Sequence, residues 1–387
     1  MSVSPVPYFE QISEPRRQTK NKKHRLSDIL CITLYGVLVG LDDWSSIAEF
    51  GRSQEAWLRT FLPLENGIPS HDTFGRVFSL ILPKAFEAAF FAWAQDVLAH
   101  WREQGRTVSA STASDEVQLA VDGKTNRRSG GKGRTALHRV HVWACEAGRV
   151  LANQAVAEKS NEITAIPEVL ALFNLKGVTV STDAMGCQKA IAWQIVKQGG
   201  DFVLALKGKQ GTLHKEVRAL LEAKASMRPP GDVTVEKGHG RLEMRRIWVT
   251  DRVEWIAPQS TFPGLKTRVM VESEREMASG RKSVERRCFL SSLPPDAARL
   301  GQKVRAHWGV ENRLHWVLDM AFNEDQCRIR TGYAAENTAI IRRFAVNLLR
   351  QDTTCKLGVK NKRLRMAYDT NYRNLTLFGS AKAPCSI

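Results

Sequence analysis

The spacing of apolar residues predicts helices throughout the first hundred residues. Hydrophobic side chains recur there every three to four positions, the period of a helix with one buried face. The predicted helices span 26–40, 44–58, 74–81 and 86–101. Pro69 and Ser70 precede the third helix as a turn and amino-terminal cap, and Pro83 ends it. We therefore expect a small helical domain over residues 1–105, followed by a Ser- and Thr-rich linker over 106–115.

The period changes to that of short strands after residue 116. Apolar runs predict strands at 117–121, 138–145, 150–156, 177–182 and 201–206. Gly148 lies between the second and third runs, in the position of a hairpin turn. Helical segments at 160–173 and 188–198 separate the last three strands. A three-strand meander followed by helix-connected strands gives an α/β (α+β) fold that resembles a ribonuclease-H-like sheet.

A less regular region interrupts this arrangement and is followed by helices. Residues 207–295 hold short alternating segments broken by Pro and Gly, so we predict a mostly β insertion there. Helices return at 296–322 and 334–350, which gives a larger domain of 116–350. The remaining residues, 351–387, form a basic tail that we predict to be a loose helix followed by coil.

The charge of the chain favours a polyanionic partner. Among its 387 residues, 57 Lys and Arg stand against 40 Asp and Glu, a formal net charge of +17. Neutralising phosphates releases their counterions, so nucleic acid is the first candidate partner. A membrane is disfavoured, since the longest apolar run, 29–41, is shorter than the roughly 20 residues of a span. Seven scattered Cys and the absence of a secretory signal predict a reduced, cytoplasmic protein.

Two aspartates follow buried strands of the predicted sheet. Asp122 comes directly after Gln118–Val121, and Asp183 comes directly after Val178–Thr182. In a ribonuclease-H-like sheet the first and fourth strands are neighbours, so these carboxylates would lie side by side. An unpaired charge at such a position is costly, and a hard divalent cation removes that cost. The alternative is that each aspartate only caps a turn.

A third carboxylate is expected from the helix that follows the insertion. Polar residues recur there every four positions and share one helix face, namely His307, Glu311, His315 and Asp319. Glu311 is the candidate that can meet a metal beside the sheet. Asp319, Glu324 and Asp325 are alternatives, and a solvated polar face is the simpler interpretation. Zinc between the two histidines is disfavoured, because no cysteine accompanies them.

Several long runs resemble the H-repeat-associated transposases, a group of DDE transposases with a β insertion before the catalytic glutamate. The runs are AVDGKTNRRSG, EKSNEITAIPEVL, STDAMGCQKAIA, DFVLALKGKQGTLH, HGRLEMR and RAHWGVENRLHWVLDMAFNEDQCRIR. The resemblance covers nearly the whole chain, and SHDTFGRVF resembles the associated amino-terminal domain. It implies an enzyme that cuts and rejoins the DNA of an insertion sequence, with Asp122, Asp183 and Glu311 as the catalytic residues.

The same resemblance implies the cofactor and the partners. Two Mg²⁺ ions, for which Mn²⁺ substitutes, would be held by the three carboxylates, and no organic cofactor is expected. The partner would be double-stranded DNA, both the terminal repeats of the element and a target, bound by a homo-oligomer. Two alternatives are a regulator that binds DNA without cutting it and a nuclease that cuts without joining.

Basic and polar residues supply the expected DNA contacts, although each is also compatible with a solvated loop. The candidates are Lys124, Arg127, Arg128, Lys207, Lys209, Arg305, Asn312, Arg313, Arg16, Arg17, Lys22, Lys23 and Arg25. The helical domain, with its basic arm, is expected to recognise the element ends. The wider class places a tyrosine, an arginine and a lysine around the glutamate, where this chain has Val304, His307 and Leu318. Hairpin-forming chemistry is therefore not carried over.

Overall fold

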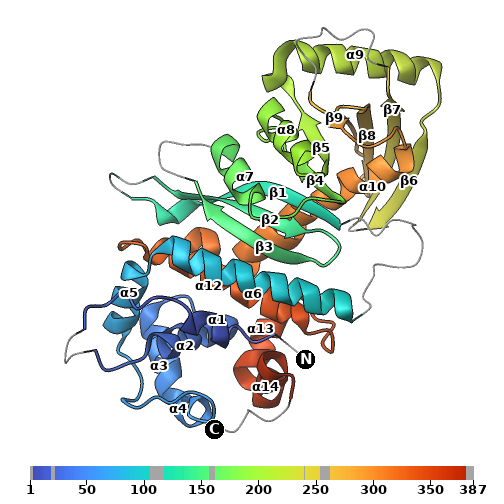
Figure 1. The fold of residues 1–387 in the computed structure, drawn as a ribbon. Helices are drawn as coiled ribbons and strands as arrows, with labels where there is room; N and C mark the ends of the chain where they lie inside the picture. Colours follow the sequence, from blue (N-terminus) through green and yellow to red (C-terminus); the bar gives the residue numbers. More distant parts are fainter. Residues whose placement is uncertain are drawn as a thin grey trace.

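The computed structural model describes most of the chain. The described residues are 3–18, 22–104, 117–131, 133, 135–156, 162–238, 240–252 and 262–380. The predicted linker, 106–115, lies outside them. In the described part, helices from both ends of the chain form one body, and a sheet with helices on both faces stands against it (Figure 1).

Helices form the amino-terminal part, as the apolar spacing predicts. They are α1 (Val6–Glu10), α2 (Leu26–Leu38), α3 (Trp44–Ser53), α4 (Glu55–Leu58), α5 (His71–Leu80) and α6 (Pro83–Glu103). The Ser70 side chain accepts a hydrogen bond from the Thr73 backbone N–H, which confirms the predicted cap. Pro83 also begins α6, where its missing N–H costs nothing. No single described helix has the length and apolar composition of a membrane span; α5 and α6 pass only as a pair bent by 91°.

The first five strands form the ribonuclease-H-like part of the sheet. They are β1 (Val117–Asn126), β2 (Leu137–Ala144), β3 (Arg149–Ala155), β4 (Val178–Thr182) and β5 (Asp201–Leu206). Their order is β3-β2-β1-β4-β5, with β1 antiparallel to β2 and parallel to β4. Helices α7 (Glu162–Leu170) and α8 (Lys189–Lys197) connect β3 to β4 and β4 to β5. The predicted fold class is confirmed.

Strand β1 is longer than predicted. Its parallel pairing with β4 ends at Val121, but its antiparallel pairing with β2 continues to Asn126. Asp122 therefore does not end the strand, as its apolar run suggests, but lies within it, across from His141. The apolar run marks only the part of β1 that has a neighbouring strand on both sides, and the pairing with β2 needs no further apolar residues.

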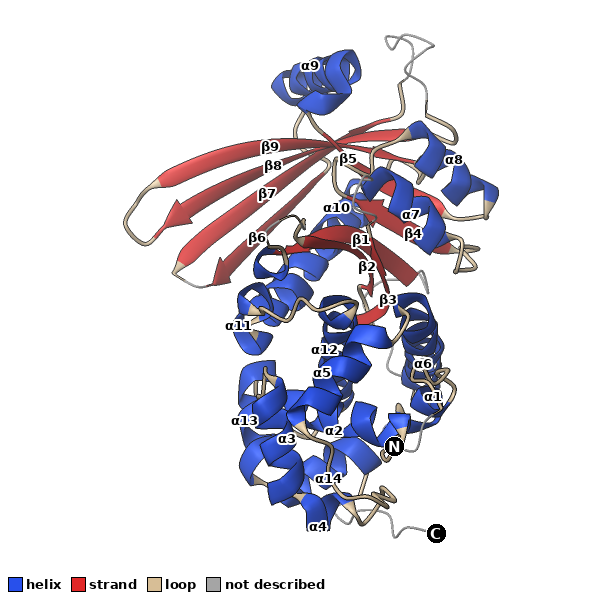
Figure 2. Ribbon diagram, turned by 90° about the vertical axis from the view of Figure 1, so that its left-hand side faces the viewer, coloured by secondary structure: helices blue, strands red, loops and turns tan. Residues whose placement is uncertain are grey.

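The insertion extends the same sheet. Its strands are β6 (Asp232–Gly238), β7 (Arg241–Thr250), β8 (Thr267–Met277) and β9 (Lys282–Ser291). All four lie within the region 207–295 that the sequence predicts to be mostly β. β9 pairs with β5, so that nine strands of the described residues form one sheet with β6 at its far edge. Figure 2 shows β6–β9 reaching away from the helical body. The insertion also holds a long helix, α9 (Gly211–Met227), that the mostly β prediction omits.

Helices cover both faces of the sheet. On one face, α7, α8 and α9 pack over a cluster that includes Leu119 and Val121 of β1. Ala120, between them, faces the opposite cluster, which is formed with α6 and α12. Side chains of a strand alternate between faces, so Asp122 shares the face of Ala120. The segment Val310–His315, which carries Glu311, contacts β1, and its Val310 and Leu314 belong to the same cluster as Ala120.

The carboxy-terminal helices differ from the prediction in two places. The helix expected over 296–322 is divided into α10 (Ala297–His307), a π-helical turn (Val310–His315) and α11 (Trp316–Phe322). The predicted helix over 334–350 is confirmed as α12 (Ala334–Gln351). The basic tail forms two helices, α13 (Val359–Tyr368) and α14 (Thr370–Phe378), because Met366, Tyr372 and Leu377 bury an apolar side against the helical body.

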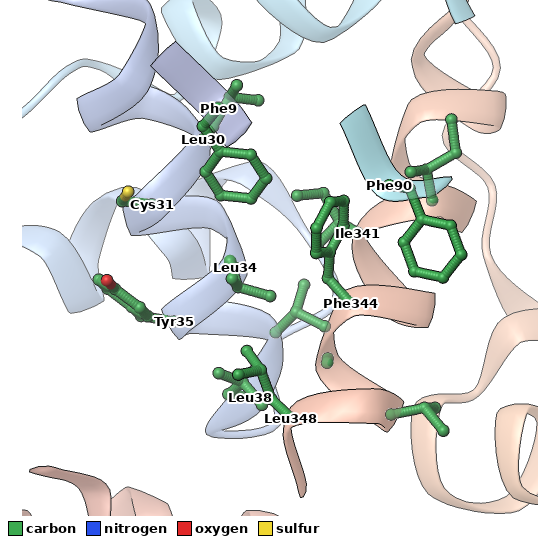
Figure 3. Packing of buried hydrophobic residues seen from close by; sticks show 14 of the residues in the cluster. Phe9, Leu30, Cys31, Leu34, Tyr35, Leu38, Phe90, Ile341, Phe344 and Leu348 are labelled. Carbon is green, nitrogen blue, oxygen red and sulfur yellow. The ribbon is translucent and has the colours of Figure 1, made fainter. Parts of the chain in front are cut away.

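The two ends of the chain share one core. The ring of Phe344 in α12 lies 5.0 Å from Phe9, 5.0 Å from Phe90 and 4.8 Å from Trp93, measured between centroids. Figure 3 shows the apolar side chains of α2 and α12 facing each other around Phe344. α12 also contacts β3. The amino-terminal helices thus hold the helix that supports the sheet.

Candidate active site

The three predicted carboxylates line one cavity of about 500 Å³. Val121 of β1 and Thr182 of β4 are paired in the parallel register, so the residues that follow them, Asp122 and Asp183, lie side by side. Glu311 reaches the same cavity from the π-helical turn. The structure therefore brings Glu311 together with two carboxylates that lie more than 120 positions before it in the sequence.

Negative charge is concentrated around Asp122. Burial raises the pKa of this carboxyl to about 8, and the charges of Asp183, Glu162 and Glu311 add to the increase. The Gly123 backbone N–H, 3.0 Å from Asp122 Oδ1, opposes it only in part. Burial and the charge of Glu162 also raise the pKa of Asp183. The site thus holds carboxylates whose repulsion a cation would relieve.

Glu162 is a fourth carboxylate of this region that the sequence analysis does not single out. It begins α7, and its Oε1 lies 2.7 Å from His138 Nε2. A side chain on Gly123 would collide with the Glu162 carboxylate, so the absence of a side chain there lets α7 approach β1. Glu162 lies in the run EKSNEITAIPEVL, one of those that resemble the transposase family, and this run could have pointed to it as a residue near the site.

The rival candidates for the third ligand surround a buried lysine. Lys124 is 6% exposed, and its Nζ lies 2.7 Å from Asp319, 3.1 Å from Asp325 and 3.8 Å from Glu324. These three carboxylates are therefore partly neutralised by Lys124, whereas Glu311 lines the cavity. The sequence analysis predicts that Lys124 contacts a DNA phosphate. In the structure its ammonium is instead enclosed by these three carboxylates of the protein.

Basic side chains line the same cavity as the carboxylates, together with Glu285, which accepts two hydrogen bonds from Arg287 at 2.7 and 3.0 Å. Lys207, which is exposed, follows β5, Arg218 belongs to α9, and Arg286 and Arg287 belong to β9. The Arg287 guanidinium lies 4.3 Å from the centroid of the Trp308 ring. Apart from Lys207, sequence reasoning missed these residues, since only the pairing of β9 with β5 brings the insertion beside the carboxylates.

The other expected DNA contacts lie at several places around the site. Arg127 and Arg128 form an exposed 3₁₀ turn after β1, with Arg127 Nε 3.2 Å from Asp325. Arg305 is bonded to Glu236 of the insertion at 2.7 Å. Asn312 and Arg313 are exposed on the π-helical turn, the latter 5.7 Å from the ring of Trp143. The side chain of Lys209 lies outside the described residues.

The basic arm is folded onto the amino-terminal helices. Arg16 forms a two-point ion pair with Glu14, with both distances 2.7 Å. Lys22 lies 4.0 Å from the same carboxylate, and Arg25 lies 3.8 Å from Glu10. Arg17, Lys23 and Arg25 are exposed. The arm thus presents basic groups on a surface separate from the carboxylate cavity.

Comparison with known proteins identifies the family. Residues 109–348 match the family model "Transposase DDE domain", and residues 6–94 match the model "DDE_Tnp_1-associated". The first match covers more than half of the chain and includes all three carboxylates. The chain belongs to the DDE transposases.

The chain is also similar to individual proteins. The transposase chain is 39% identical over 372 residues to the H repeat-associated putative transposase YhhI of Escherichia coli (strain K12), covering 94% of this chain and 95% of the relative. It is 57% identical over 299 residues to an uncharacterized protein in the dhlA 3′ region of Xanthobacter autotrophicus, covering 76% and 97%. A piggyBac transposase in a cryo-EM synaptic complex with hairpin DNA aligns with 99% of this chain and 82% of its own, at 11% identity and a TM-score of 0.40.

DDE transposases use divalent metal ions, and the donor set of this cavity suits one. Carboxylate oxygens are the ligands that Mg²⁺ and Mn²⁺ prefer, and the repulsion that raises the pKa of Asp122 is relieved when a cation is shared. Within the described ranges, no three His, Cys, Asp or Glu side chains already form a cluster that could hold an ion. The cavity thus presents the ligands without a closed coordination geometry.

Proposed function

We propose that this DDE transposase cleaves DNA at the ends of its insertion sequence and joins the ends to a target. Asp122, Asp183 and Glu311 would hold two Mg²⁺ ions, for which Mn²⁺ would substitute. The observation that carries the proposal is the cavity itself, which is lined by the three carboxylates and also by basic side chains. Such a cavity matches a phosphodiester, which needs metal on its reacting oxygens and cations on its flanking phosphates.

The residues of the chain divide this work between them. When bound, divalent ions activate the attacking oxygen, water for cleavage and a 3′-hydroxyl for joining, and stabilise the leaving oxygen. Lys207 would donate hydrogen bonds to phosphate oxygens beside the reacting group, and Arg287, which is paired with Glu285 in the absence of DNA, would exchange that partner for phosphate. Arg127 and Arg128 extend the basic surface past Asp122. No protein nucleophile is required.

The remaining parts of the proposal concern recognition. We expect the amino-terminal helices and the basic arm, Arg16 to Arg25, to bind the terminal repeats of double-stranded DNA, and a homo-oligomer to form on the paired ends. Deleting residues 1–105 would disrupt the core shared with α12, so substitutions in the arm are the better test. Since the substrate is chromosomal, we expect the reaction in the cytoplasm, at the nucleoid.

The experiment that tests the proposal uses the full chain and a duplex that carries the ends of the element. Incubation with a supercoiled target plasmid, with Mg²⁺ or with a chelator, should give end cleavage and joined products only when the metal is present. Asp122→Asn is the matched inactive control. Cleavage without joined products would identify a nuclease, and specific binding without cleavage would identify a DNA-binding regulator.

A further inference from the structure

A chain of buried polar side chains leads away from Asp122 into the protein. His315 ends the π-helical turn, His141 lies across from Asp122 in β2, and Arg343 belongs to α12. His141 and Arg343 are fully buried, and His315 is 8% exposed. The metal proposal does not use these groups, although each of them costs desolvation energy to bury.

The contacts between these side chains are continuous. Arg343 donates to His141 Nε2 from Nε at 3.1 Å and from Nη2 at 2.9 Å. His141 Nδ1 lies 3.3 Å from His315 Nε2, and His315 Nδ1 lies 3.6 Å from Asp122 Oδ2. The last distance is a few tenths of an ångström beyond hydrogen-bond length. Glu324, which is completely buried, accepts two hydrogen bonds from Arg343 at the other end.

The guanidinium fixes the direction of the hydrogen bonds from Arg343 through His141 to His315. Arg343 can only donate, so His141 Nε2 accepts and His141 carries its proton on Nδ1. The reverse assignment would leave His141 with no proton on either nitrogen. His141 therefore donates to His315 Nε2, and His315 in turn carries its proton on Nδ1, pointed at Asp122. Burial and the charge of Arg343, which hold the pKa of His141 well below its usual value, agree with a neutral ring.

We propose that Arg343, His141 and His315 form a one-way donor chain that orients the Asp122 carboxylate for metal binding, with both imidazoles held as the Nδ1–H tautomer. The three are positioning residues, and the inference rests on the proposed role of Asp122 as a ligand. Asp122 Oδ1 accepts from the Gly123 N–H at 3.0 Å, and His315 faces Oδ2. Each oxygen retains a second lone pair toward the cavity.

The donor chain also explains why α12 matters to the site. Arg343 faces the sheet, while its neighbour Phe344 packs in the core of the amino-terminal helices. Arg343 is further held by Ala339 O, 2.8 Å from its Nη1. The orientation of Asp122 is therefore tied to the helical body rather than to the sheet alone.

The first test reads the tautomers directly in the metal-free, full-length protein. Labelling the histidines with ¹⁵N allows two-bond ¹H–¹⁵N spectra to distinguish Nδ1–H from Nε2–H rings. His141 and His315 are assigned from the signals lost in His141→Gln and His315→Gln. We expect both rings as Nδ1–H. An Nε2–H ring at either position would overturn the proposal, and this result does not depend on any metal.

The second test measures the affinity for Mn²⁺ alone by calorimetry. His315→Asn keeps an N–H near the δ position, whereas His315→Gln places its amide near the ε position. Since the partners of metal ligands typically contribute 10- to 100-fold to affinity, we expect His315→Gln to weaken binding about 10-fold and His315→Asn about 3-fold or less. His100→Gln, on α6, is the control, and circular dichroism checks the fold of each variant.

The outcomes separate this inference from the proposed function. If Asp122→Ala weakens Mn²⁺ binding but His315→Gln does not, the donor chain is wrong and the metal site stands. If Asp122→Ala leaves Mn²⁺ binding unchanged, the metal site itself is wrong. Equal losses in His315→Asn and His315→Gln, with both proteins folded, would show that the direction of the hydrogen bond is unimportant and would also overturn the donor chain.

Discussion

The sheet and the helix supply the carboxylates of this site in different ways. Asp122 and Asp183 follow paired residues of two parallel strands, so the backbone hydrogen bonds of the sheet fix their spacing. Burial, and after it the charge of nearby carboxylates, raises the pKa values of both. Glu311 is exposed and stands on a π-helical turn between two α-helices. The spacing of the sheet half of the site, Asp122 and Asp183, is therefore set by strand pairing, whereas the helix half, Glu311, approaches the cavity from an exposed turn.

This difference has a functional meaning. π-helical turns are rare and are frequently found at functional sites, where the irregular turn re-aims a side chain. If the three carboxylates hold metal as proposed, we expect the exposed Glu311 to contribute less to metal binding in the absence of DNA than Asp122 and Asp183 do.

The largest expected effect comes from removing each carboxylate. Asp122→Ala, Asp183→Ala and Glu311→Ala should each lower the rate of DNA cleavage by roughly 1,000-fold or more, equivalent to about 4 kcal/mol of transition-state stabilisation. Binding of DNA should survive, because the basic surface is untouched. Cleavage and filter-binding assays on the same substrate measure both properties.

The same variants separate the two halves of the site. Without DNA, Asp122→Ala and Asp183→Ala should weaken Mn²⁺ binding strongly, while Glu311→Ala should leave it close to that of the unchanged protein. Equal losses in all three variants would show that the helix half is as preorganised as the sheet half.

The second prediction concerns the raised pKa of Asp122 and its effect on the stability of the protein at different pH values. The pKa of Asp122 is about 8 in the folded protein against 3.8 unfolded, so the folded state binds this proton more tightly. The stability that this proton provides is present below pH 4 and is lost as the pH rises toward 8, at about 1.4 kcal/mol per unit. Asp122→Asn lacks this loss. In the presence of a chelator, the free energy of unfolding of Asp122→Asn should therefore exceed that of the unchanged protein by an amount that grows between pH 4 and pH 8 and then levels off.

Urea denaturation at several pH values measures this difference. Glu168→Gln, an exposed position on α7, is the matched control, and its stability relative to the unchanged protein should not follow the same curve. A pH-independent difference between Asp122→Asn and the unchanged protein would contradict the raised pKa. Adding Mn²⁺ should remove the loss at pH 8, because the cation replaces the proton.

The contrast between the two halves also explains what the sequence could predict. Asp122 and Asp183 were accessible to pattern reasoning, because buried strands have a clear apolar signal and their order fixes which strand ends meet. The helical repeat favoured Glu311 but left Asp319 open, since both lie on the same helix face, and the resemblance to a family then selected Glu311. The π-helical turn was missed because hydrogen bonding, rather than apolar spacing, defines it.

Two further features could not be predicted for a related reason. α9 was missed although Leu213, Val217 and Leu221 recur every four residues, because the surrounding Gly, Pro and short strands dominated the pattern. The burial of Lys124 depends on carboxylates about 200 positions away. A run of basic residues after a strand shows charge but not which side chain the fold encloses.

A third, smaller effect distinguishes Glu311 from its rival on the same helix. Asp319→Ala removes one of the carboxylates around Lys124, which should destabilise the fold by roughly 1–3 kcal/mol. Its rate of cleavage at low temperature should stay within about 10-fold of the unchanged protein, since Asp319 pairs with Lys124 and is not among the residues that line the carboxylate cavity. If Asp319→Ala is folded but inactive while Glu311→Ala retains its activity, the third ligand is Asp319 and the helix half has been assigned wrongly.

The smallest expected effect lies outside both halves, in the basic arm. Replacing Lys22, Lys23 and Arg25 together with Ala should leave the cleavage rate of bound DNA unchanged but weaken binding. The slope of log K against log salt should fall by about two to three units if all three contact phosphates. Binding to unrelated DNA should weaken as much as binding to the element ends, because phosphate contacts carry no sequence information.

A control with the same loss of charge is provided by Lys237, Arg281 and Lys282, which are exposed on the insertion around the β6–β7 and β8–β9 turns. An equal fall in that control would mean that net charge alone sets the slope, whereas an unchanged slope with lost preference for the ends would mean that the arm reads bases in a groove.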